Sequence, residues 1–241
     1  MKGFFRSIAA TFGFCTILPI GNNVDFDYYA KRYYLMPLVG YLTGCIAAGV
    51  AILFGSTQFS AAASIAVILI LYGFNHLDGL LDFGDGLMAH GSREKRIKAL
   101  TDQNVGAGGV GLAMVVILMT YSGLSSISMM PAAIIAAEVC AKFSQVAMIA
   151  LGEPLREGIH SYVRSFGKNY YVIPALILCM PVILLPFSLK EFSAIAAALF
   201  ISIAAVYFAA TRLFGGVNGD VDGATGEITR MAVIAALALA V

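Results

Sequence analysis

Long apolar runs alternate with short polar segments along the whole chain. The apolar runs cover residues 35–54, 61–77, 110–124, 131–151, 171–186, 192–210 and 231–241. A helix needs roughly 20 predominantly apolar residues to cross the hydrocarbon core of a membrane, so the first six runs predict spanning helices. The seventh run is short. It spans only if its helix begins inside the glycine-rich segment before it or if the bilayer thins locally.

The first twenty residues show a different pattern. Apolar side chains recur there near helical spacing, at Phe4, Phe5, Ile8, Phe12 and Cys15. Lys2 and Arg6 lie outside this stripe, as expected for an amphipathic helix in the membrane interface. The alternative is a cleaved signal peptide, but no small-x-small cleavage site follows the apolar part. We therefore expect this segment to stay in the mature protein.

The composition agrees with a chain embedded in lipid, because 60% of the residues are hydrophobic and only 12% are charged. Once the spans are assigned, little of the chain remains for a soluble domain. The predicted fold class is all-α: a polytopic membrane helical bundle of about seven transmembrane helices plus an N-terminal interfacial helix. We expect a single integral-membrane domain over residues 1–241. The net charge of +1, without a basic run, argues against nucleic-acid binding.

Lysine and arginine residues are distributed unevenly among the predicted connections. With the N-terminus inside, nearly all of them fall in internal segments, and only Lys190 is external. The external connections 55–60 and 125–130 carry no charge. Because basic residues accumulate on the cytoplasmic side, we predict a multi-pass protein of the cell (inner) membrane. Its N-terminus and all of its polar motifs would then face the cytoplasm.

The segment 75–86, at the end of the second span, carries three carboxylates. Asp78, Asp82 and Asp85 stand at i, i+4 and i+7, so a helix would place them on one face. Their mutual repulsion predicts a counter-cation, and Mg²⁺ or Mn²⁺ takes oxygen ligands while keeping positions open for substrate phosphate. The alternative is a solvated helix end without a ligand. His76 is either a substrate contact or hydrogen-bonded packing.

Glycines and basic residues surround this acidic motif. Gly79, Gly84 and Gly86 either let the backbone approach a ligand closely or end the helix. Arg93 and Arg96, in the next polar segment, are suited to hold phosphate opposite the metal. Positive-inside topology alone would also place basic residues there.

The segment 101–111 is a polar run that opens into glycines before the next span. Asp102 lies near its start, and the glycines begin at Gly106. Backbone N–H groups at such a helix start can cradle an anion. Small residues also serve close helix packing, so this pattern alone is weak evidence for a binding site.

A second acidic and glycine-rich stretch covers residues 215–227. Asp220 and Glu227 stand at i and i+7, so a helix that begins here would direct both toward a common ligand, with Asn218 just before it. The alternative is a flexible loop with incidental acids. On the predicted topology this stretch and the first acidic motif share one side of the membrane.

The fourth span contains charged residues of its own. Glu138, Lys142 and Gln145 recur at helical spacing and must face protein, because lipid would not solvate them. We expect Glu138 and Lys142 to form an ion pair inside the bundle; direct substrate contact is the alternative. Arg156 follows on the side of the acidic motifs, within reach of a large anionic substrate.

Together these motifs resemble the cobalamin synthase family, the adenosylcobinamide-GDP ribazoletransferases. The resemblance covers nearly the whole chain and rests on segments 14–19, 76–86, 100–106, 156–158 and 215–224. The two acidic motifs among them are quite specific when they occur together.

The resemblance implies a transferase that joins adenosylcobinamide-GDP to α-ribazole, or to α-ribazole 5′-phosphate, and releases GMP by Mg²⁺-assisted phosphoryl-type transfer. The catalytic residues implied are Asp78, Asp82, Asp85 and Asp220, and the first three would also bind Mg²⁺ or Mn²⁺. The substrate-binding residues implied are His76, Arg93, Arg96, Asp102, Gly106, Arg156, Asn218 and Glu227. The other expected partners are membrane lipid and either further copies of the chain or other nucleotide-loop enzymes.

Two other classes fit parts of the pattern. A CDP-alcohol phosphotransferase also carries carboxylates on membrane helices, but its D-G-x-x-A-R start is absent, because Asp78 and Gly79 are followed by Leu-Leu-Asp-Phe. An ion transporter would also use charges within the membrane, but it should show inverted repeats. The segments 78–86 and 218–226 share only composition.

Overall fold

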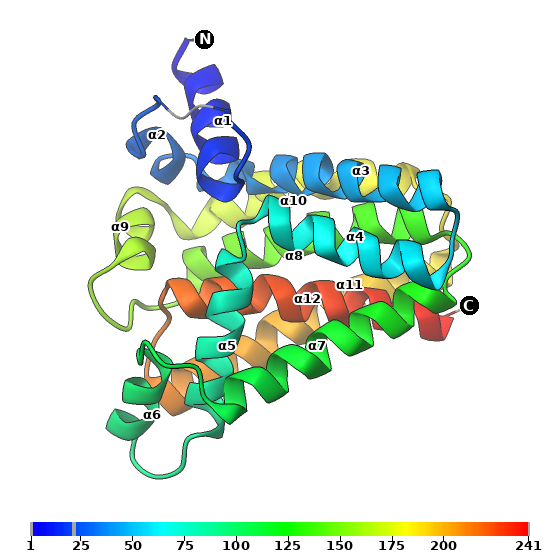
Figure 1. Ribbon diagram of the computed structural model, residues 1–241. Helices are drawn as coiled ribbons and strands as arrows, with labels where there is room; N and C mark the ends of the chain where they lie inside the picture. The colour runs from blue at the N-terminus through cyan, green and yellow to red at the C-terminus, as the bar shows by residue number, and fades with distance from the viewer. Residues whose placement is uncertain (1, 21–22, 241) are drawn as a thin grey trace.

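The computed structural model describes residues 2–20 and 23–240, and within them the regular structure is helical (Figure 1). The longer helices are α1 (Lys2–Cys15), α3 (Met36–Phe54), α4 (Gln58–Leu71), α5 (Asn75–Met88), α7 (Ala107–Ser126), α8 (Met130–Leu151), α11 (Leu189–Ala209) and α12 (Gly219–Ala240). The shorter ones are α2 (Asp27–Ala30), α6 (Arg93–Leu100), α9 (Ile159–Phe166) and α10 (Val172–Cys179), with single turns η1 (Tyr33–Leu35), η2 (Asn169–Tyr171), η3 (Met180–Leu184) and η4 (Ala210–Phe214).

In the part of the chain that the structure describes, five helical segments are long and apolar enough to cross a membrane by themselves. The number rises to seven if two bent pairs each count as one span. The five are Tyr33–Phe54, Ala107–Ser126, Met130–Leu151, Leu189–Phe214 and Gly219–Ala240. The predicted all-α polytopic bundle is therefore confirmed. The short run 231–241 gains its missing length in the first of the two ways considered, because α12 begins inside the glycine-rich segment, at Gly219.

The run 61–77 does not form the straight span that its apolar residues predict. Helix α4 ends at Leu71, and the chain bends by 94° into α5. Gly73 and Phe74 both adopt left-handed backbone angles, with φ of 58° and 60°. Glycine does so without steric cost, whereas Phe74 is an uncommon case of a bulky residue in this conformation. As a result, α5 crosses the end of the bundle (Figure 1).

Helix α8 lies at the centre of the bundle. Every residue from Ala136 to Ala150 is buried, because α3 and α12 pack along this helix. Small residues allow the close approach: a methyl group at Gly40 of α3 would lie 2.6 Å from the carbonyl oxygen of Glu138. The charged residues of the fourth span thus face protein on all sides, as their position in a membrane protein requires.

The glycines of the first acidic motif neither end α5 nor leave it open to a ligand. A methyl group at Gly79 would lie 2.7 Å from the carbonyl oxygen of Asp220 on α12. One at Gly84 would lie 2.9 Å from the carbonyl oxygen of Gly108 on α7. These glycines therefore allow α5 to pack closely between α12 and α7, which corrects both interpretations given by the sequence.

The N-terminal segment forms the predicted helix. Helix α1 lies with α2 at the same end of the bundle as α5, α6 and α9 (Figure 1). Its Phe4 and Phe5 side chains are exposed, whereas Ser7 and Thr11 are buried. The exposed phenylalanines are suited to an interfacial position.

The two ends of the bundle provide a direct test of the predicted orientation. Ser92 and Glu157 are exposed at the end that carries the acidic motifs, whereas Ser56 is exposed in the connection between α3 and α4. In a variant without the native cysteines, we expect Ser92→Cys and Glu157→Cys to react with an impermeant thiol reagent only after the membrane is opened. Ser56→Cys should react in intact cells. Labelling of Ser92→Cys in intact cells would reject the orientation.

Candidate functional site

The crossing of α5 and α12 brings the two acidic motifs together. At the crossing, Gly79 lies against the Asp220 backbone and Gly223 lies against His76. A methyl group at Gly223 would be 3.2 Å from the Cα atom of His76. The charges that act on the Asp82 carboxyl are those of Asp220, Asp78 and Asp85, together with Arg156. Four carboxylates and one guanidinium therefore share one region, at the end of the bundle.

The carboxylates of the first motif differ in their hydrogen bonds. Asp85 accepts from the backbone N–H groups of Gly106 at 2.6 Å and Gly109 at 2.8 Å. The backbone N–H groups at the start of α7 therefore bind a carboxylate of the protein itself. Asp78 and Asp82 accept no hydrogen bond from any side chain or backbone group that the structure describes. A direct contact from the Gly106 N–H to a substrate would require the bond to Asp85 to open.

Asn218 fixes the start of α12. Its side-chain oxygen accepts from the Val221 N–H at 3.1 Å, which caps the helix, and its amide donates to the Asp220 carboxylate at 2.6 Å. The preceding chain is also held, because Pro154 and Val217 form an isolated parallel bridge. The Leu155 N–H donates to the Val217 carbonyl and the Val217 N–H to the Glu153 carbonyl, both at 2.8 Å. This bridge brings the loop that carries Arg156 beside Asp220.

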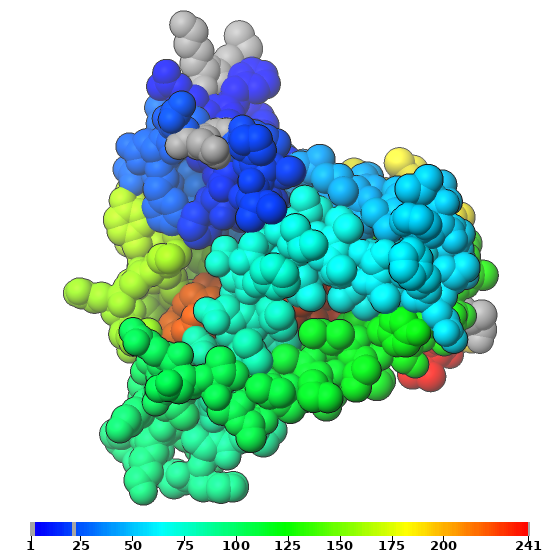
Figure 2. All heavy atoms as spheres, viewed as in Figure 1, coloured from blue at the N-terminus to red at the C-terminus, as the bar shows by residue number. Residues whose placement is uncertain are grey.

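Two adjoining cavities lie over this crossing. The larger has a volume of about 340 Å³ and the smaller about 260 Å³. They share the residues Ile159, His160, Gly219 and Asp220. Figure 2 shows the corresponding hollow between α9 and α5, with the start of α12 visible at its floor. Asp78 and His76 line the larger cavity, whereas Arg156 and Asn218 line the smaller one.

A histidine and a carboxylate that the sequence interpretation did not select also line the larger cavity. His160 Nδ1 lies 2.8 Å from Asp222 Oδ2, and His160 Nε2 lies 3.2 Å from the carbonyl oxygen of Gly152. Both ring nitrogens thus face acceptors, and the second oxygen of Asp222 is buried without a hydrogen-bond partner among residues 2–20 and 23–240. Sixty-two positions separate the two residues, so no local motif could have paired them.

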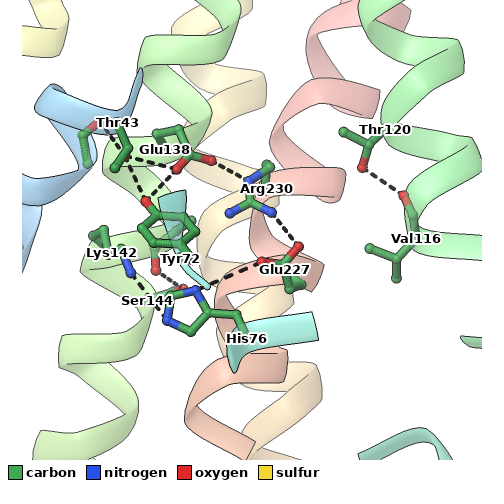
Figure 3. A network of polar contacts seen from close by, with 12 residues as sticks. Thr43, Tyr72, His76, Val116, Thr120, Glu138, Lys142, Ser144, Glu227 and Arg230 are labelled. Atoms are coloured by element: carbon green, nitrogen blue, oxygen red, sulfur yellow. Dashed lines mark hydrogen bonds and ion pairs between the residues drawn. The ribbon is translucent and has the colours of Figure 1, made fainter. Parts of the chain in front are cut away.

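Below the cavities, a buried network of charges joins α8, α12 and the end of α4 (Figure 3). Arg230 forms ion pairs with Glu138 and with Glu227. The Tyr72 hydroxyl donates to Glu138 at 2.5 Å and lies 2.7 Å from the Thr43 hydroxyl. Glu138 therefore pairs with Arg230, and the expected ion pair between Glu138 and Lys142 is wrong.

Lys142 has other partners in this network. Its ammonium donates to Gln145 at 3.1 Å, lies 3.3 Å from His76 Nε2, and lies over the Tyr72 ring at 3.9 Å from its centre (Figure 3). His76 thereby joins the buried network to the wall of the larger cavity. Glu227 points into the network and pairs with Arg230, so it does not share a ligand-facing surface with Asp220 in this structure.

The remaining predicted substrate contacts lie at the edge of the site. Arg96 donates to the Leu87 carbonyl at 2.8 Å, which satisfies the end of α5, and Arg93 lies against Gly215. Asp102 accepts from the backbone and side-chain N–H groups of Asn104, and these bonds hold the pKa of Asp102 below its ordinary value. None of these contacts brings Asp102 to the Asp82 carboxyl.

The donor set is suited to a hard cation, although its side chains are not preformed into a cage. Among residues 2–20 and 23–240, no three His, Cys, Asp or Glu side chains are grouped closely enough to hold an ion together. Asp78 and Asp82 nevertheless offer unbonded carboxylate oxygens, and each Asp85 oxygen keeps a second lone pair. Mg²⁺ is typically bound by one or two carboxylates with water and substrate phosphate completing its shell, which this set can provide.

Comparison with known proteins decides the family. A model of the cobalamin-5-phosphate synthase family matches residues 7–238. The chain belongs to this family.

Relatives of known name support the same assignment. A protein of Methanocella arvoryzae is 34% identical, in an alignment that covers 95% of this chain and 94% of the relative. A protein of Pyrococcus abyssi is 33% identical, and the alignment covers 93% of this chain and 94% of that relative. A protein of Methanococcoides burtonii is 31% identical over 100% of this chain and 94% of its own. All three are named adenosylcobinamide-GDP ribazoletransferase. No solved structure matches the chain.

The pairing of Glu138 can be tested by a double-mutant cycle in this family member. Arg230→Met alone leaves Glu138 and Glu227 buried without their cation, so it should destabilise the protein more than the double variant with Glu138→Gln. We expect a coupling free energy of about 1 to 3 kcal/mol, measured by unfolding in detergent. The matched cycle of Lys142→Met with Glu138→Gln should give a smaller coupling. A larger coupling to Lys142 than to Arg230 would contradict the network.

Proposed function

We propose that this chain joins adenosylcobinamide-GDP to α-ribazole, or to α-ribazole 5′-phosphate, and releases GMP. The observation that carries the proposal is the meeting of the two acidic motifs at the crossing of α5 and α12, in a chain that matches named ribazoletransferases over nearly its whole length. The family match also argues against a lipid headgroup transferase and against an ion transporter.

The proposed reaction is a phosphoryl-type transfer. A ribazole hydroxyl oxygen attacks the phosphorus that carries cobinamide, and the bond from this phosphorus to the oxygen of GMP breaks. GMP leaves with the electron pair of that bond, and the hydroxyl proton passes to a carboxylate. We assign this proton acceptor to Asp220, because its carboxylate lines both cavities. Such a reaction depends mainly on positioning and electrostatic stabilisation, with little covalent participation by the protein.

Asp78, Asp82 and Asp85 are the residues that we assign to Mg²⁺, with Mn²⁺ as a substitute. When bound, the ion would neutralise charge on the phosphate oxygens. The carboxylates around Asp82 repel one another, and the nearby Arg156 supplies only one positive charge. The excess negative charge supports a cation in this region.

Arg156 is placed to contact the diphosphate of the corrinoid substrate. It is exposed and lines the smaller cavity, and its positive charge attracts the carboxylates of both Asp82 and Asp220. A guanidinium offers planar donors that match phosphate oxygens. Arg93 and Arg96 lie on α6, beside the end of α5, and would contact an extended substrate. His76, Asn218 and Glu227 would act from within the protein by holding the cavity walls in place.

The predicted setting is the cytoplasmic face of the cell membrane, with the transmembrane helices holding the site at the membrane surface. Membrane lipid surrounds the bundle in this setting. Further copies of the chain or other nucleotide-loop enzymes are the protein partners that we expect.

The assignment of Asp82 gives the sharpest test of this function. Asn keeps the size of the side chain but removes the charge, so Asp82→Asn should lower the rate of GMP release by about 100-fold or more at limiting Mg²⁺. The protein should still fold, because removing one of several repelling carboxylates relieves repulsion when no metal is bound. GMP release from purified, membrane-inserted protein is the measurement.

Asp25→Asn is the matched control. Asp25 is exposed before α2, and its carboxylate accepts only from the Asp27 N–H among its described contacts. Its turnover should equal that of the unmodified chain. Near-normal turnover of Asp82→Asn at limiting Mg²⁺, with insertion confirmed, would remove the proposed metal and phosphate role of this residue.

A further inference from the structure

The larger cavity has two chemically different walls. Aromatic and aliphatic side chains from α1, α2, α8 and α9 form one wall: Phe14, Tyr29, Ile149, Ile159 and Val163. The rings of Phe14 and Tyr29 lie together, with centres 4.5 Å apart. Polar side chains line the rest of the cavity: Asn75, His76 and Asp78 on α5, Asp220 and Asp222 on α12, and Gln145 and His160. A ligand that fills this cavity therefore needs an apolar, preferably aromatic, part and a polar part that tolerates carboxylates.

We infer that this cavity binds the nucleoside substrate, with its bicyclic aromatic base against the Phe14 and Tyr29 wall and its sugar hydroxyls toward Asp78 and Asp220. This inference rests on the proposed function. It goes further because it assigns one of the two substrates to a defined place.

The cavity volume selects between the two substrates. At about 340 Å³, the cavity lies at the lower end of the range of small-molecule pockets, which is about 300 to 1,000 Å³. A nucleoside of one bicyclic base and one ribose fits such a space. A corrin macrocycle with its side chains is far too large to be enclosed, so the corrinoid part must stay outside.

The chemistry of the base distinguishes the ribazole substrate from a guanosine nucleotide. Against Phe14, Ile149 and Val163, the polar edge of guanine would lose its hydrogen bonds to water without replacement. A dimethylbenzimidazole base has no N–H donor and carries two methyl groups, so an apolar aromatic wall solvates it well.

The smaller cavity completes the arrangement. It shares Gly219 and Asp220 with the larger one and adds Arg156 and the backbone of Gly158. A phosphate held at Arg156 would therefore lie on the far side of Asp220 from the nucleoside. This places the hydroxyl nucleophile, its proton acceptor and the phosphorus of the other substrate along a common wall.

The chain contains no tryptophan, so the fluorescence of a single introduced tryptophan reports only on its own surroundings. We would compare Phe14→Trp, which lines the larger cavity, with Phe54→Trp, which lies at the end of α3. Both phenylalanines are partly exposed, at 41% and 48%. Titration of the membrane-embedded protein with α-ribazole should change the emission of Phe14→Trp saturably and leave that of Phe54→Trp unchanged. GMP should cause no change in either variant.

A second measurement guards against loss of folding in the reporter variant. Ile149→Phe adds bulk to the apolar wall, so it should raise the KM for α-ribazole at least about tenfold while changing the KM for adenosylcobinamide-GDP less than about twofold. Leu151→Phe, which is on the same helix but exposed, should change neither value. A general loss of stability would not raise the KM for one substrate and leave the KM for the other nearly unchanged.

The outcomes separate this inference from the proposed function. If the unmodified chain releases no GMP from the two substrates, the proposed function fails. If it does release GMP, but Phe14→Trp responds to GMP and not to α-ribazole, the cavity binds guanosine and the inference is wrong. The inference is equally contradicted if Phe14→Trp shows no response in active protein, or if Ile149→Phe raises the KM of the corrinoid instead.

Discussion

The close crossing of α5 and α12 is the contact on which the rest of the site depends. A side chain at Gly79 would collide with the Asp220 backbone, and one at Gly223 would press on His76. Because both positions are glycine, the two helices approach until their carboxylates share one region. The same approach requires α5 to run across the end of the bundle, which the left-handed turn at Gly73 and Phe74 provides. Helix packing and site chemistry are therefore parts of one arrangement.

The buried network beneath this crossing balances charge where water is scarce. Arg230 and Lys142 bring two positive charges, and Glu138 and Glu227 bring two negative ones, so the group is neutral as a whole. Buried ions are costly unless they are paired and hydrogen-bonded, and this network pairs Arg230 twice. It also holds Tyr72 and His76, whose outer faces line the larger cavity. The interior of the bundle thus fixes one wall of the site.

The sequence predicted what depends on local spacing and missed what depends on distant contacts. Apolar runs predicted the helical membrane fold, and the spacing of Asp78 and Asp82 correctly predicted a helix that carries both. The partner of Glu138 was misassigned to the nearby Lys142, because Arg230 lies 92 positions away. The bend before α5 depends on two left-handed residues, one of them the bulky Phe74, and no periodicity signals it. The catalytic and metal roles of the carboxylates stay predictions.

The central proposal is that the carboxylates of α5 bind a cation beside Asp220 of α12, at the crossing of the two helices. Mn²⁺ binding to the full chain in membranes, followed by electron paramagnetic resonance, tests it without requiring turnover. We predict that Asp82→Asn on α5 and Asp220→Asn on α12 each weaken Mn²⁺ binding by at least about tenfold, because a ligand or a neighbour of the ion loses its charge in both cases. Mn²⁺ binding that is lost in Asp82→Asn but unchanged in Asp220→Asn would contradict a cation site next to Asp220, at the crossing of the two helices.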